Sequence, residues 1–301
     1  MLKEKFRGIV VPIVTVFRSD GSIDAERMKT FVGYLIDECR VHGIFCPGST
    51  GDYTLLTLDE RKSLIELIVK HVDGRVPVYA GTGHNATQTA SALTRFAQEV
   101  GADAALVSLP HYPRPTQEGL YVHYCTLAQE SDIPIMVYNY PGGMGLDISP
   151  EIVARLAKED RIQGIKDSVD DLDHTNLILR DVGDQLAVFQ GMDAKLFQSL
   201  VMGCVGLVGT VSNIAPKQFV AIWDAVQKGD YEQARSLQLM LLDLCLQVTY
   251  EQGVTKAALE LMGFHAGAHR LPVTPASSDR VKRVRVALDR LGLLGQLKSI
   301  A

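Results

Sequence analysis

The stretch IQGIKDS, residues 162–168, places one lysine at the end of a short apolar run typical of a β-strand. Lysine rarely occupies the buried end of a strand, because removing an ammonium group from water is costly unless the charge is paired. A protein can lower the pKa of such an amine, which makes it a nucleophile toward carbonyl carbon atoms. The pattern therefore predicts a strand over 162–166 with Lys166 at its reactive end.

A second strand-like run, PIMVYNYP at residues 134–141, ends in a polar tip that carries the phenols of Tyr138 and Tyr140. Phenols can carry protons during carbonyl chemistry. A nucleophilic amine and a phenolic proton carrier at the ends of different strands suit the formation of a Schiff base.

Outward from these two runs, apolar β-rich segments alternate with amphipathic segments along the chain. The alternation repeats every ~25–30 residues, which favours a closed (β/α)8 barrel in the α/β class. An open doubly wound sheet is the alternative, but no G-x-G-x-x-G follows the first strand. The expected strands are 8–16, 43–47, 76–81, 104–109, 135–140, 162–166, 186–190 and 205–210.

The amphipathic segments are expected to form helices, and several carry start signals. The expected helices include 25–38, 58–71, 86–100, 117–130 and 150–158. The capping signals are Thr57 with Glu60, Asn85 with Gln88, and Ser149 before Pro150.

After the eighth strand the pattern predicts four more helices, at 216–228, 231–248, 254–262 and 279–294. A barrel needs only one helix after its last strand, so we expect an appended C-terminal helical region. No Pro/Ser-rich linker separates it. We therefore expect one catalytic unit, with the barrel over residues 1–225 and the helical region over 226–301 packed on it.

Composition narrows the class of protein. The 301 residues are 47% hydrophobic and 22% charged, which is typical of a globular enzyme, and the net charge of −5 argues against nucleic-acid partners.

No apolar run reaches the ~20 residues that span a bilayer, and residues 1–10 lack a secretory signal. Five scattered cysteines without a CxxC pair indicate reduced thiols. A cytoplasmic location without a membrane partner is therefore predicted.

Reactive groups gather after the expected strands, where (β/α)8 barrels build their active sites. These groups are Gly48, Ser49 and Thr50, then Tyr112, Tyr138 and Tyr140, then Lys166 and Ser168, and finally Gly191, Asp193, Thr210 and Asn213. Hydroxyls between glycines, as at 48–51, expose backbone N–H groups that suit carboxylate binding. With Lys166 as nucleophile, the set predicts a 2-oxo acid substrate.

Each residue also has a plain structural interpretation. Lys166 could pair with Asp167, Tyr138 could pack in the core, and residues 48–51 could form an ordinary turn. Asp193 alone fits a helix N-cap better than a binding residue. The combination of lysine, tyrosine and hydroxyl loop on three strands is more specific than any one of them.

Two further expectations concern charge and metals. Asp167, Asp170 and Asp171 are expected to form a solvated helix start. The eight histidines show no HxH or HExxH spacing, so no metal site is predicted.

At these residues the chain resembles the dihydrodipicolinate synthase/N-acetylneuraminate lyase family of Schiff-base class I aldolases. The resemblance runs from 8–12 to 271–275. It is most specific at GSTGD (48–52), AGTGHNAT (80–87), VYNYP (137–141) and GIKDS (164–168). It implies a TIM barrel with a C-terminal helical region, usually a homotetramer assembled as a dimer of dimers, without metal or organic cofactor.

By position, the resemblance implies roles for individual residues. Lys166 would form a covalent imine with the keto carbon of pyruvate, and Tyr138 would shuttle protons. Ser49 would link Tyr138 to solvent or to a neighbouring tyrosine, and Thr50 would bind the substrate carboxylate. Tyr112 falls where many relatives donate a phenol across a subunit interface.

Three departures from the family pattern bear on the substrate. Biosynthetic dihydrodipicolinate synthases have an arginine two residues after the YNxP proline, where this chain has Gly143. Loss of such a bidentate clamp should weaken carboxylate recognition. Sialic acid lyases use an acidic pair at strand seven, whereas Asp193 is followed by Ala194. Asp52 replaces the usual glutamate of GxTGE.

The tyrosine in YNYP and the segment 164–170 most resemble 2-keto-3-deoxy sugar-acid aldolases, with Asp193, Thr210 and Ser168 as hydroxyl-binding residues. The expected function is reversible cleavage of a 2-keto-3-deoxy sugar acid to pyruvate and an aldehyde. One alternative is 4-hydroxy-tetrahydrodipicolinate synthase, which condenses pyruvate with aspartate semialdehyde. Others are a sugar-acid dehydratase and a catalytically inactive barrel that binds a small molecule.

Overall fold

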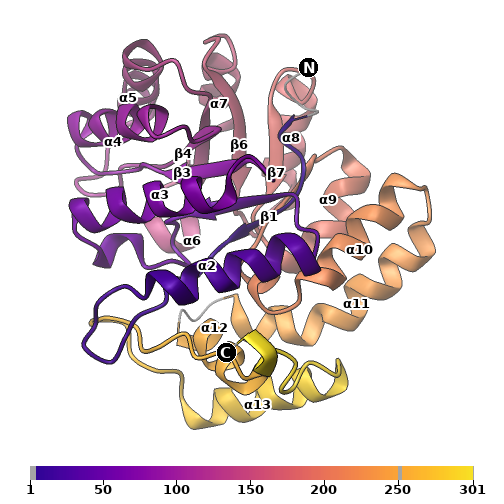
Figure 1. Cartoon of the computed structure of the whole chain (residues 1–301). Helices are drawn as coiled ribbons and strands as arrows, with labels where there is room; N and C mark the ends of the chain where they lie inside the picture. The colour runs from indigo at the N-terminus through magenta and orange to yellow at the C-terminus, as the bar shows by residue number, and fades with distance from the viewer. Residues whose placement is uncertain (1–4, 250–252, 301) are drawn as a thin grey trace.

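Eight parallel strands close into a barrel in the computed structural model, which describes residues 5–249 and 253–300 (Figure 1). Each strand pairs with the next one along the chain, and β8 returns to β1. The (β/α)8 prediction is therefore confirmed, and the open-sheet alternative is wrong. The strands are β1 Gly8–Pro12, β2 Gly43–Cys46, β3 Val78–Gly81, β4 Ala104–Ser108, β5 Ile135–Asn139, β6 Ile162–Asp167, β7 Ala187–Gln190 and β8 Gly206–Val208.

Most strands are shorter than the apolar runs that predicted them. The first run extends to residue 16, but β1 ends at Pro12. The N–H of Ile13 still donates to the Phe45 carbonyl of β2 at 3.1 Å, and later backbone N–H groups bond outside the sheet. Val14, for example, donates its N–H to the side-chain oxygen of Asn213 at 3.2 Å. An apolar run indicates that its residues are buried, but not that they pair in a sheet. Val14 and Val16 are buried, and their N–H groups bond outside the sheet.

The register of the barrel brings two predicted site residues together. Tyr138 of β5 lies opposite Lys166 of β6 in the parallel ladder, and Asn139 lies opposite Asp167. Because side chains alternate across a strand, Tyr138 and Lys166 share one side of the barrel wall while Asn139 and Asp167 share the other. A register shift between Ile135 and Met136 precedes this pairing.

Helices follow the strands, and most of them cover the outside of the barrel. They are α2 Ala25–Gly33, α3 Leu58–Val72, α4 Thr87–Glu99, α5 Gln117–Glu130, α6 Pro141–Met144, α7 Pro150–Leu156, α8 Leu172–Val182, α9 Leu196–Met202 and α10 Pro216–Gln227. The predicted 25–38 helix is α2 followed by a π-helical turn, Tyr34–Glu38. Strand residues are almost all buried, because helices cover one side of the sheet and packed side chains fill the other.

Two of the three predicted capping signals are confirmed. The Thr57 hydroxyl and the Glu60 side chain form the full capping box of α3, and the Ser149 hydroxyl caps α7. The Asn85 prediction is wrong, because α4 has Ala86 at its N-cap and no side-chain cap. Asn85 instead accepts hydrogen bonds from the backbone of the loop after β4.

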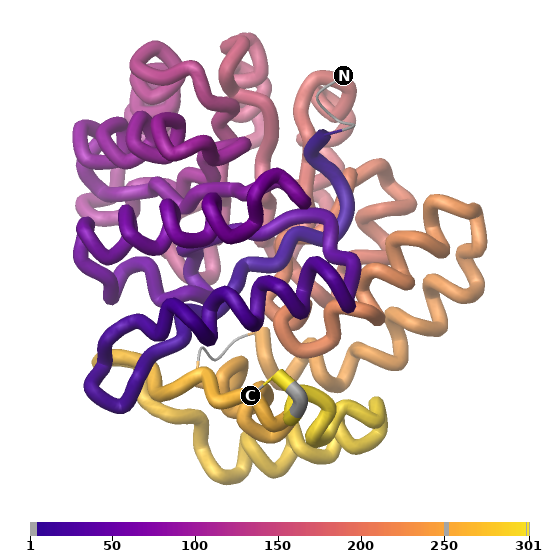
Figure 2. The backbone as a smooth tube through the Cα atoms, in the orientation of Figure 1, coloured from indigo at the N-terminus to yellow at the C-terminus, as the bar shows by residue number. Residues whose placement is uncertain are grey.

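The C-terminal helices α11 Tyr231–Val248, α12 Gly253–Met262 and α13 Ser278–Arg290 follow the barrel. Figure 2 shows the C-terminal helices folded beside α2. The Phe31 and Phe264 rings stack across this contact with centroids 4.9 Å apart. The division of the chain at residue 225 remains a prediction.

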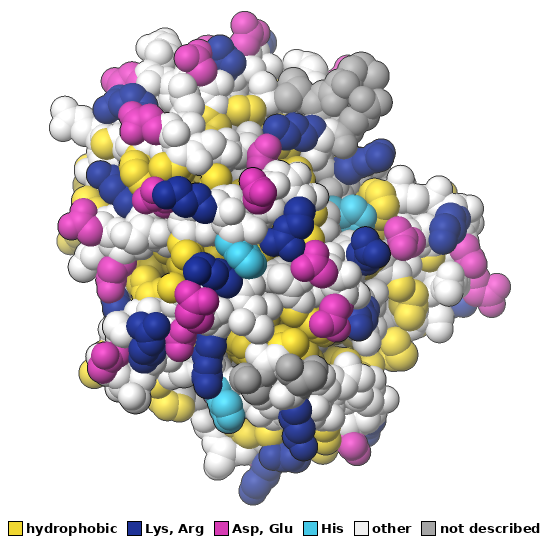
Figure 3. Space-filling view, in the orientation of Figure 1, with side chains coloured by type: hydrophobic (Ala, Val, Ile, Leu, Met, Phe, Trp, Pro, Cys, Tyr) yellow, Lys and Arg dark blue, Asp and Glu magenta, His cyan; other side chains and the backbone are white. Residues whose placement is uncertain are grey.

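Charged side chains of both signs are interspersed over the face shown in Figure 3, between small apolar areas. This mixture agrees with the small net charge of −5. Within residues 5–249 and 253–300, none of the helices has the length and apolar character needed to cross a membrane.

Candidate active site

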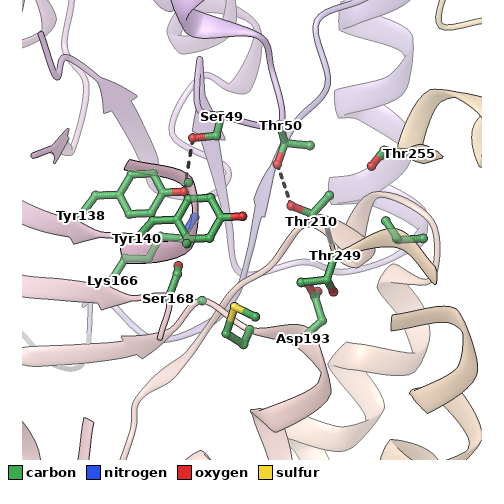
Figure 4. Close-up of a pocket in the computed structure, with 15 residues that line it drawn as sticks. Ser49, Thr50, Tyr138, Tyr140, Lys166, Ser168, Asp193, Thr210, Thr249 and Thr255 are labelled. Atoms are coloured by element: carbon green, nitrogen blue, oxygen red, sulfur yellow. Dashed lines mark hydrogen bonds between the residues drawn. The ribbon is translucent and has the colours of Figure 1, made fainter. Parts of the chain in front are cut away.

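A cavity of about 350 Å³ lies at the C-terminal ends of the barrel strands (Figure 4). Its lining includes most of the residues predicted from the sequence: Ser49, Thr50, Tyr138, Lys166, Ser168, Gly191, Asp193 and Thr210. The structure therefore gathers into one cavity groups that are spread along the sequence from Ser49 to Thr210.

Lys166 is 5% exposed, and its amine faces aromatic rings. The Nζ atom lies 3.9 Å from the centre of the Tyr138 ring and 5.6 Å from that of Phe45. Lys166 forms no ion pair with any residue that the structure describes. Burial lowers the pKa of Lys166 to about 7, although the negative charge of Asp193 opposes the shift. A large fraction of the amine is therefore uncharged and nucleophilic near neutral pH.

The interpretation that Lys166 pairs with Asp167 is wrong, because the two side chains lie on opposite sides of β6. Asp167 is fully buried behind the strand, which also contradicts its predicted place in a solvated helix start. Asp171, by contrast, is the N-cap of α8. The Asp167 carboxylate accepts hydrogen bonds from Thr175 Oγ1 (2.7 Å), Asn139 Nδ2 (2.9 Å) and His174 Nδ1 (3.1 Å).

This network of hydrogen bonds behind β5 and β6 predicts that the stability of the fold depends on pH. Burial alone would lower the pKa of His174, but the hydrogen bond and charge of Asp167 outweigh it and raise the pKa to about 9. A raised pKa stabilises the fold fully below the unfolded value of about 6.5, by up to about 3 kcal/mol. This contribution declines as the pH rises through about 9.

We expect a His174→Gln variant to lack that component of stability. Urea unfolding of both proteins from pH 6 to pH 10 should show the free-energy difference between them shrinking as the pH rises. If the free-energy difference between the two proteins stays constant from pH 6 to pH 10, the protonated imidazole of His174 contributes nothing to stability.

The phenol of Tyr138 lies beside the hydroxyl loop. Its Oη atom is 3.3 Å from Ser49 Oγ, within hydrogen-bonding distance. Burial raises the pKa of Tyr138 to about 12, against the opposing effects of the Ser49 and Ser168 hydroxyls. The phenol therefore keeps its proton at neutral pH and can donate it. Tyr140 stacks on Tyr138 with ring centroids 6.3 Å apart and nearly parallel planes.

The GSTGD loop presents two hydroxyls to the cavity. The N–H of Gly51 donates back to the Gly48 carbonyl at 3.0 Å, so the loop is a tight turn as well as part of the site. Thr50 Oγ1 lies 2.8 Å from Thr210 Oγ1. Gly48 does not line the main cavity. A Cβ there would lie 2.4 Å from the Phe45 ring, so Gly48 allows the backbone to approach that ring.

Asp193 is a buried residue of the cavity wall, and its interpretation as a helix N-cap is wrong. Met192 is the N-cap of the short helix that follows, and Asp193 Oδ1 accepts the backbone N–H of Val211 at 3.0 Å. Burial raises the pKa of Asp193, against the opposing effects of that hydrogen bond and of Lys166. The neighbouring Gly191 is required by packing, since a Cβ would lie 1.8 Å from Ser168 Oγ.

Tyr112 lies outside the cavity of its own chain. Its side chain is 78% exposed, and its backbone N–H donates to Asn85 Oδ1 at 3.2 Å. A contribution of this phenol to a neighbouring subunit, as the resemblance implies, stays a prediction.

Sequence reasoning missed part of the cavity wall. The missed residues are Gly142, Gly143, Met192, Val248, Thr249 and Thr255. Gly143 was known only as a departure from the family pattern, and the structure gives the reason: a Cβ there would lie 2.3 Å from the Tyr140 ring. Among the described lining residues, Lys166 carries the only cationic group. The residues from the C-terminal helices had no sequence signal, because only tertiary packing brings them to the barrel.

No group of three or more His, Cys, Asp or Glu side chains suited to a metal occurs in the part of the chain that the structure describes.

The chain compares closely with known proteins over almost its whole length. The dihydrodipicolinate synthetase family model matches residues 5–291. A 4-hydroxy-tetrahydrodipicolinate synthase from Syntrophobacter fumaroxidans is 39% identical over 292 residues, which cover 96% of this chain and 100% of that protein.

Solved structures give the same result. A monomeric variant of dihydrodipicolinate synthase superposes with a TM-score of 0.93 at 35% identity, over 97% of this chain and 99% of the other. A prophage protein of the dihydrodipicolinic acid synthase family from E. coli K12, solved in complex with pyruvate, gives 0.91 at 31% identity, over 96% and 99%.

These comparisons confirm the family resemblance found in the sequence motifs. The name of the relative agrees with the alternative function, 4-hydroxy-tetrahydrodipicolinate synthase, rather than with the expected sugar-acid aldolase. Enzymes of this family hold pyruvate as a covalent imine on a lysine and use no external cofactor, and a buried amine such as that of Lys166 suits this chemistry. The chain is therefore a pyruvate-dependent lyase of the Schiff-base type, and it belongs to the dihydrodipicolinate synthetase family.

Proposed function

We propose that this enzyme holds pyruvate on Lys166 and joins it reversibly to an uncharged hydroxyaldehyde, so that its substrate is a 2-keto-3-deoxy sugar acid. One observation carries the choice of acceptor. At Gly143, where the family pattern has a carboxylate-binding arginine, a Cβ would lie 2.3 Å from the Tyr140 ring, and no other cation joins Lys166 among the described residues of the cavity wall. Hydroxyl groups make up most of the remaining polar lining.

The proposed reaction begins with attack of the uncharged Lys166 amine on the keto carbon of the sugar acid. Tyr138 donates a proton to the former keto oxygen, which leaves as water and gives the protonated imine. The Tyr138 phenolate then takes the proton from the C4 hydroxyl, the C3–C4 bond breaks, and the electron pair of that bond moves into the imine, which gives an enamine, a free aldehyde and the neutral phenol. Protonation of the enamine carbon and hydrolysis release pyruvate and restore Lys166.

The other residues hold the two ends of the substrate. The carboxylate of the 2-oxo acid binds at Ser49 and Thr50, with the Ser49 hydroxyl beside the Tyr138 phenol. Hydroxyls of the aldehyde half bind Ser168, Asp193 and Thr210. Donors fixed in a buried cavity stabilise charge as it develops, because they need no reorientation during the reaction.

The partner's Tyr112 would complete the proton path if the protein forms the homotetramer that the family resemblance implies. Because a similar solved structure is a monomeric variant, membership of the family does not decide the assembly. Sedimentation of the purified protein would establish the assembly directly.

A second candidate is 4-hydroxy-tetrahydrodipicolinate synthase, which the names of the curated relatives favour. Its acceptor, aspartate semialdehyde, carries a carboxylate that needs a cationic partner on the acceptor side. Charged hydrogen bonds contribute about 1.5–3 kcal/mol, so the lack of such a partner should lower the use of this acceptor about 10- to 100-fold.

Pyruvate consumption with two acceptors separates the candidates. We expect kcat/KM with glyceraldehyde to exceed that with aspartate semialdehyde at least about tenfold. The opposite preference would identify the enzyme as the synthase and refute the proposed acceptor. Equal preincubation with pyruvate in both assays ensures that only the acceptor differs.

A further inference from the structure

The C-terminal helical region supplies one wall of the cavity. Val248 and Thr249 reach it from the end of α11, and Thr255 reaches it from the first turn of α12. Figure 4 shows Thr255 on the same side of the cavity as Thr50 and Thr210, across from Tyr138. Thr255 is only 2% exposed, so it belongs to the buried wall of the cavity rather than to its rim.

The residue after Thr255 enters a buried charge cluster formed by Asp52, Lys256 and His269. Lys256 Nζ lies 3.7 Å from Asp52 Oδ2, and His269 Nδ1 lies 2.8 Å from the same oxygen. The side chains of Asp52, Lys256 and His269 are 0%, 3% and 4% exposed, respectively. Lys256 Nζ also donates to the Ala268 carbonyl at 3.4 Å.

This buried charge cluster joins two segments that are distant in sequence but both line the site. Asp52 ends the GSTGD loop that carries Thr50, and its backbone has a φ of 58°, in the left-handed region. Lys256 lies one residue from Thr255, and successive helical residues project about 100° apart. Lys256 can therefore be held in the cluster while Thr255 faces the cavity. A buried charge that loses its partner is strongly destabilised, so the cluster fixes these segments relative to each other.

We propose that Thr255 binds a hydroxyl group of the aldehyde half of the substrate. The buried charge cluster is the positioning device that holds Thr255 beside Thr50 and Thr210. The ligand class is an aldehyde with hydroxyls beyond its reacting carbon, because a threonine both donates and accepts one hydrogen bond without adding charge. This inference rests on the proposed function, in which Lys166 carries the pyruvate half and the acceptor is a hydroxyaldehyde.

A Thr255→Val variant tests the subsite with two acceptors of the same carbon chain length. With pyruvate as donor, we expect KM for glyceraldehyde to rise about three- to tenfold, the effect of one lost hydrogen bond, while KM for propionaldehyde stays at the wild-type value. Thr255→Ser, which keeps the hydroxyl, should restore most of the glyceraldehyde KM. An unchanged glyceraldehyde KM, or an equal rise for both aldehydes, would overturn the proposal.

Thr126→Val is the matched control, since the Thr126 hydroxyl donates to the Val122 carbonyl on the exposed face of α5. Borohydride trapping of pyruvate separates this inference from the proposed function. Wild-type protein that fails to trap pyruvate on Lys166 refutes the proposed function itself. Normal trapping with no selective effect of Thr255→Val refutes only the subsite.

The positioning role is tested by combining Asp52→Asn with Thr255→Val. If the cluster acts through Thr255, Asp52→Asn raises KM for glyceraldehyde in the wild-type background and adds little in the Thr255→Val background. Equal effects in both backgrounds would show that Asp52 acts independently of Thr255 and overturn this role. His269→Gln replaces Asp52→Asn in the same cycle if the latter does not fold.

Discussion

A Lys166→Met variant should lose both turnover and the ability to trap pyruvate covalently. Methionine keeps a long unbranched side chain between the Tyr138 and Phe45 rings, and it removes a buried group that carries charge part of the time. The fold should therefore persist while the nucleophile is absent. Removing the nucleophile of a covalent mechanism lowers kcat by several powers of ten, so we expect a fall of at least about 10³-fold.

Borohydride reduction in the presence of pyruvate, followed by peptide mass mapping, measures this directly. Wild-type protein should carry one reduced adduct on the peptide that contains Lys166, and the variant should carry none. Lys217→Met, on the exposed surface of α10, controls for nonspecific reduction. An adduct that persists in Lys166→Met, for example on the other buried lysine, Lys256, would contradict the assignment.

The ionisable groups Lys166 and Asp193 determine the net charge of the cavity. Lys166 has a lowered pKa and Asp193 a raised one, mainly because both are buried. Both pKa shifts favour the uncharged forms of the two side chains, so Lys166 and Asp193 together add little net charge to the cavity. In the proposed reaction, the carboxylate of pyruvate adds a fixed negative charge, which the hydroxyls of Ser49 and Thr50 would bind by donating hydrogen bonds.

The sequence predicted the parts of the site that depend on the period of a strand. Lys166 and Tyr138 were found because each is a polar residue at the end of an apolar run, and adjacent strands of a barrel place such ends together. The same reasoning failed for Asp167, one residue further on. Whether a carboxylate after the strand faces water or lies under a helix depends on partners such as His174 and Thr175.

The acceptor side of the cavity could not be predicted in this way. Thr249 follows the last residue of α11 and Thr255 lies in α12. The sequence pattern of these helices indicates only that they pack, and nothing local indicates that they pack beside the strand ends. For Gly143, the sequence showed the departure but not its structural reason. Its departure from the family pattern was visible, but the reason, the position of the Tyr140 ring, required the three-dimensional arrangement.

A Tyr138→Phe variant should separate covalent capture from turnover. The ring contacts with Tyr140 and Phe45 remain, so Lys166 keeps its aromatic surroundings and its depressed pKa. Only the phenolic proton and its hydrogen bond to Ser49 are lost. Loss of a positioned proton carrier slows catalysis about 10²- to 10⁴-fold, and we expect kcat to fall by that factor.

Slow trapping of pyruvate by borohydride should survive in Tyr138→Phe, because water can replace the phenol as a poor proton source during imine formation. Tyr124→Phe is the matched control: Tyr124 is also fully buried, but its hydroxyl donates to the Val107 carbonyl at 2.7 Å outside the cavity. That control should lose stability and keep its kcat, because one buried hydrogen bond contributes to folding and not to proton transfer. If Tyr138→Phe turned over at the wild-type rate, proton transfer would have to proceed through another group, and the Tyr138–Ser49 contact would be structural only.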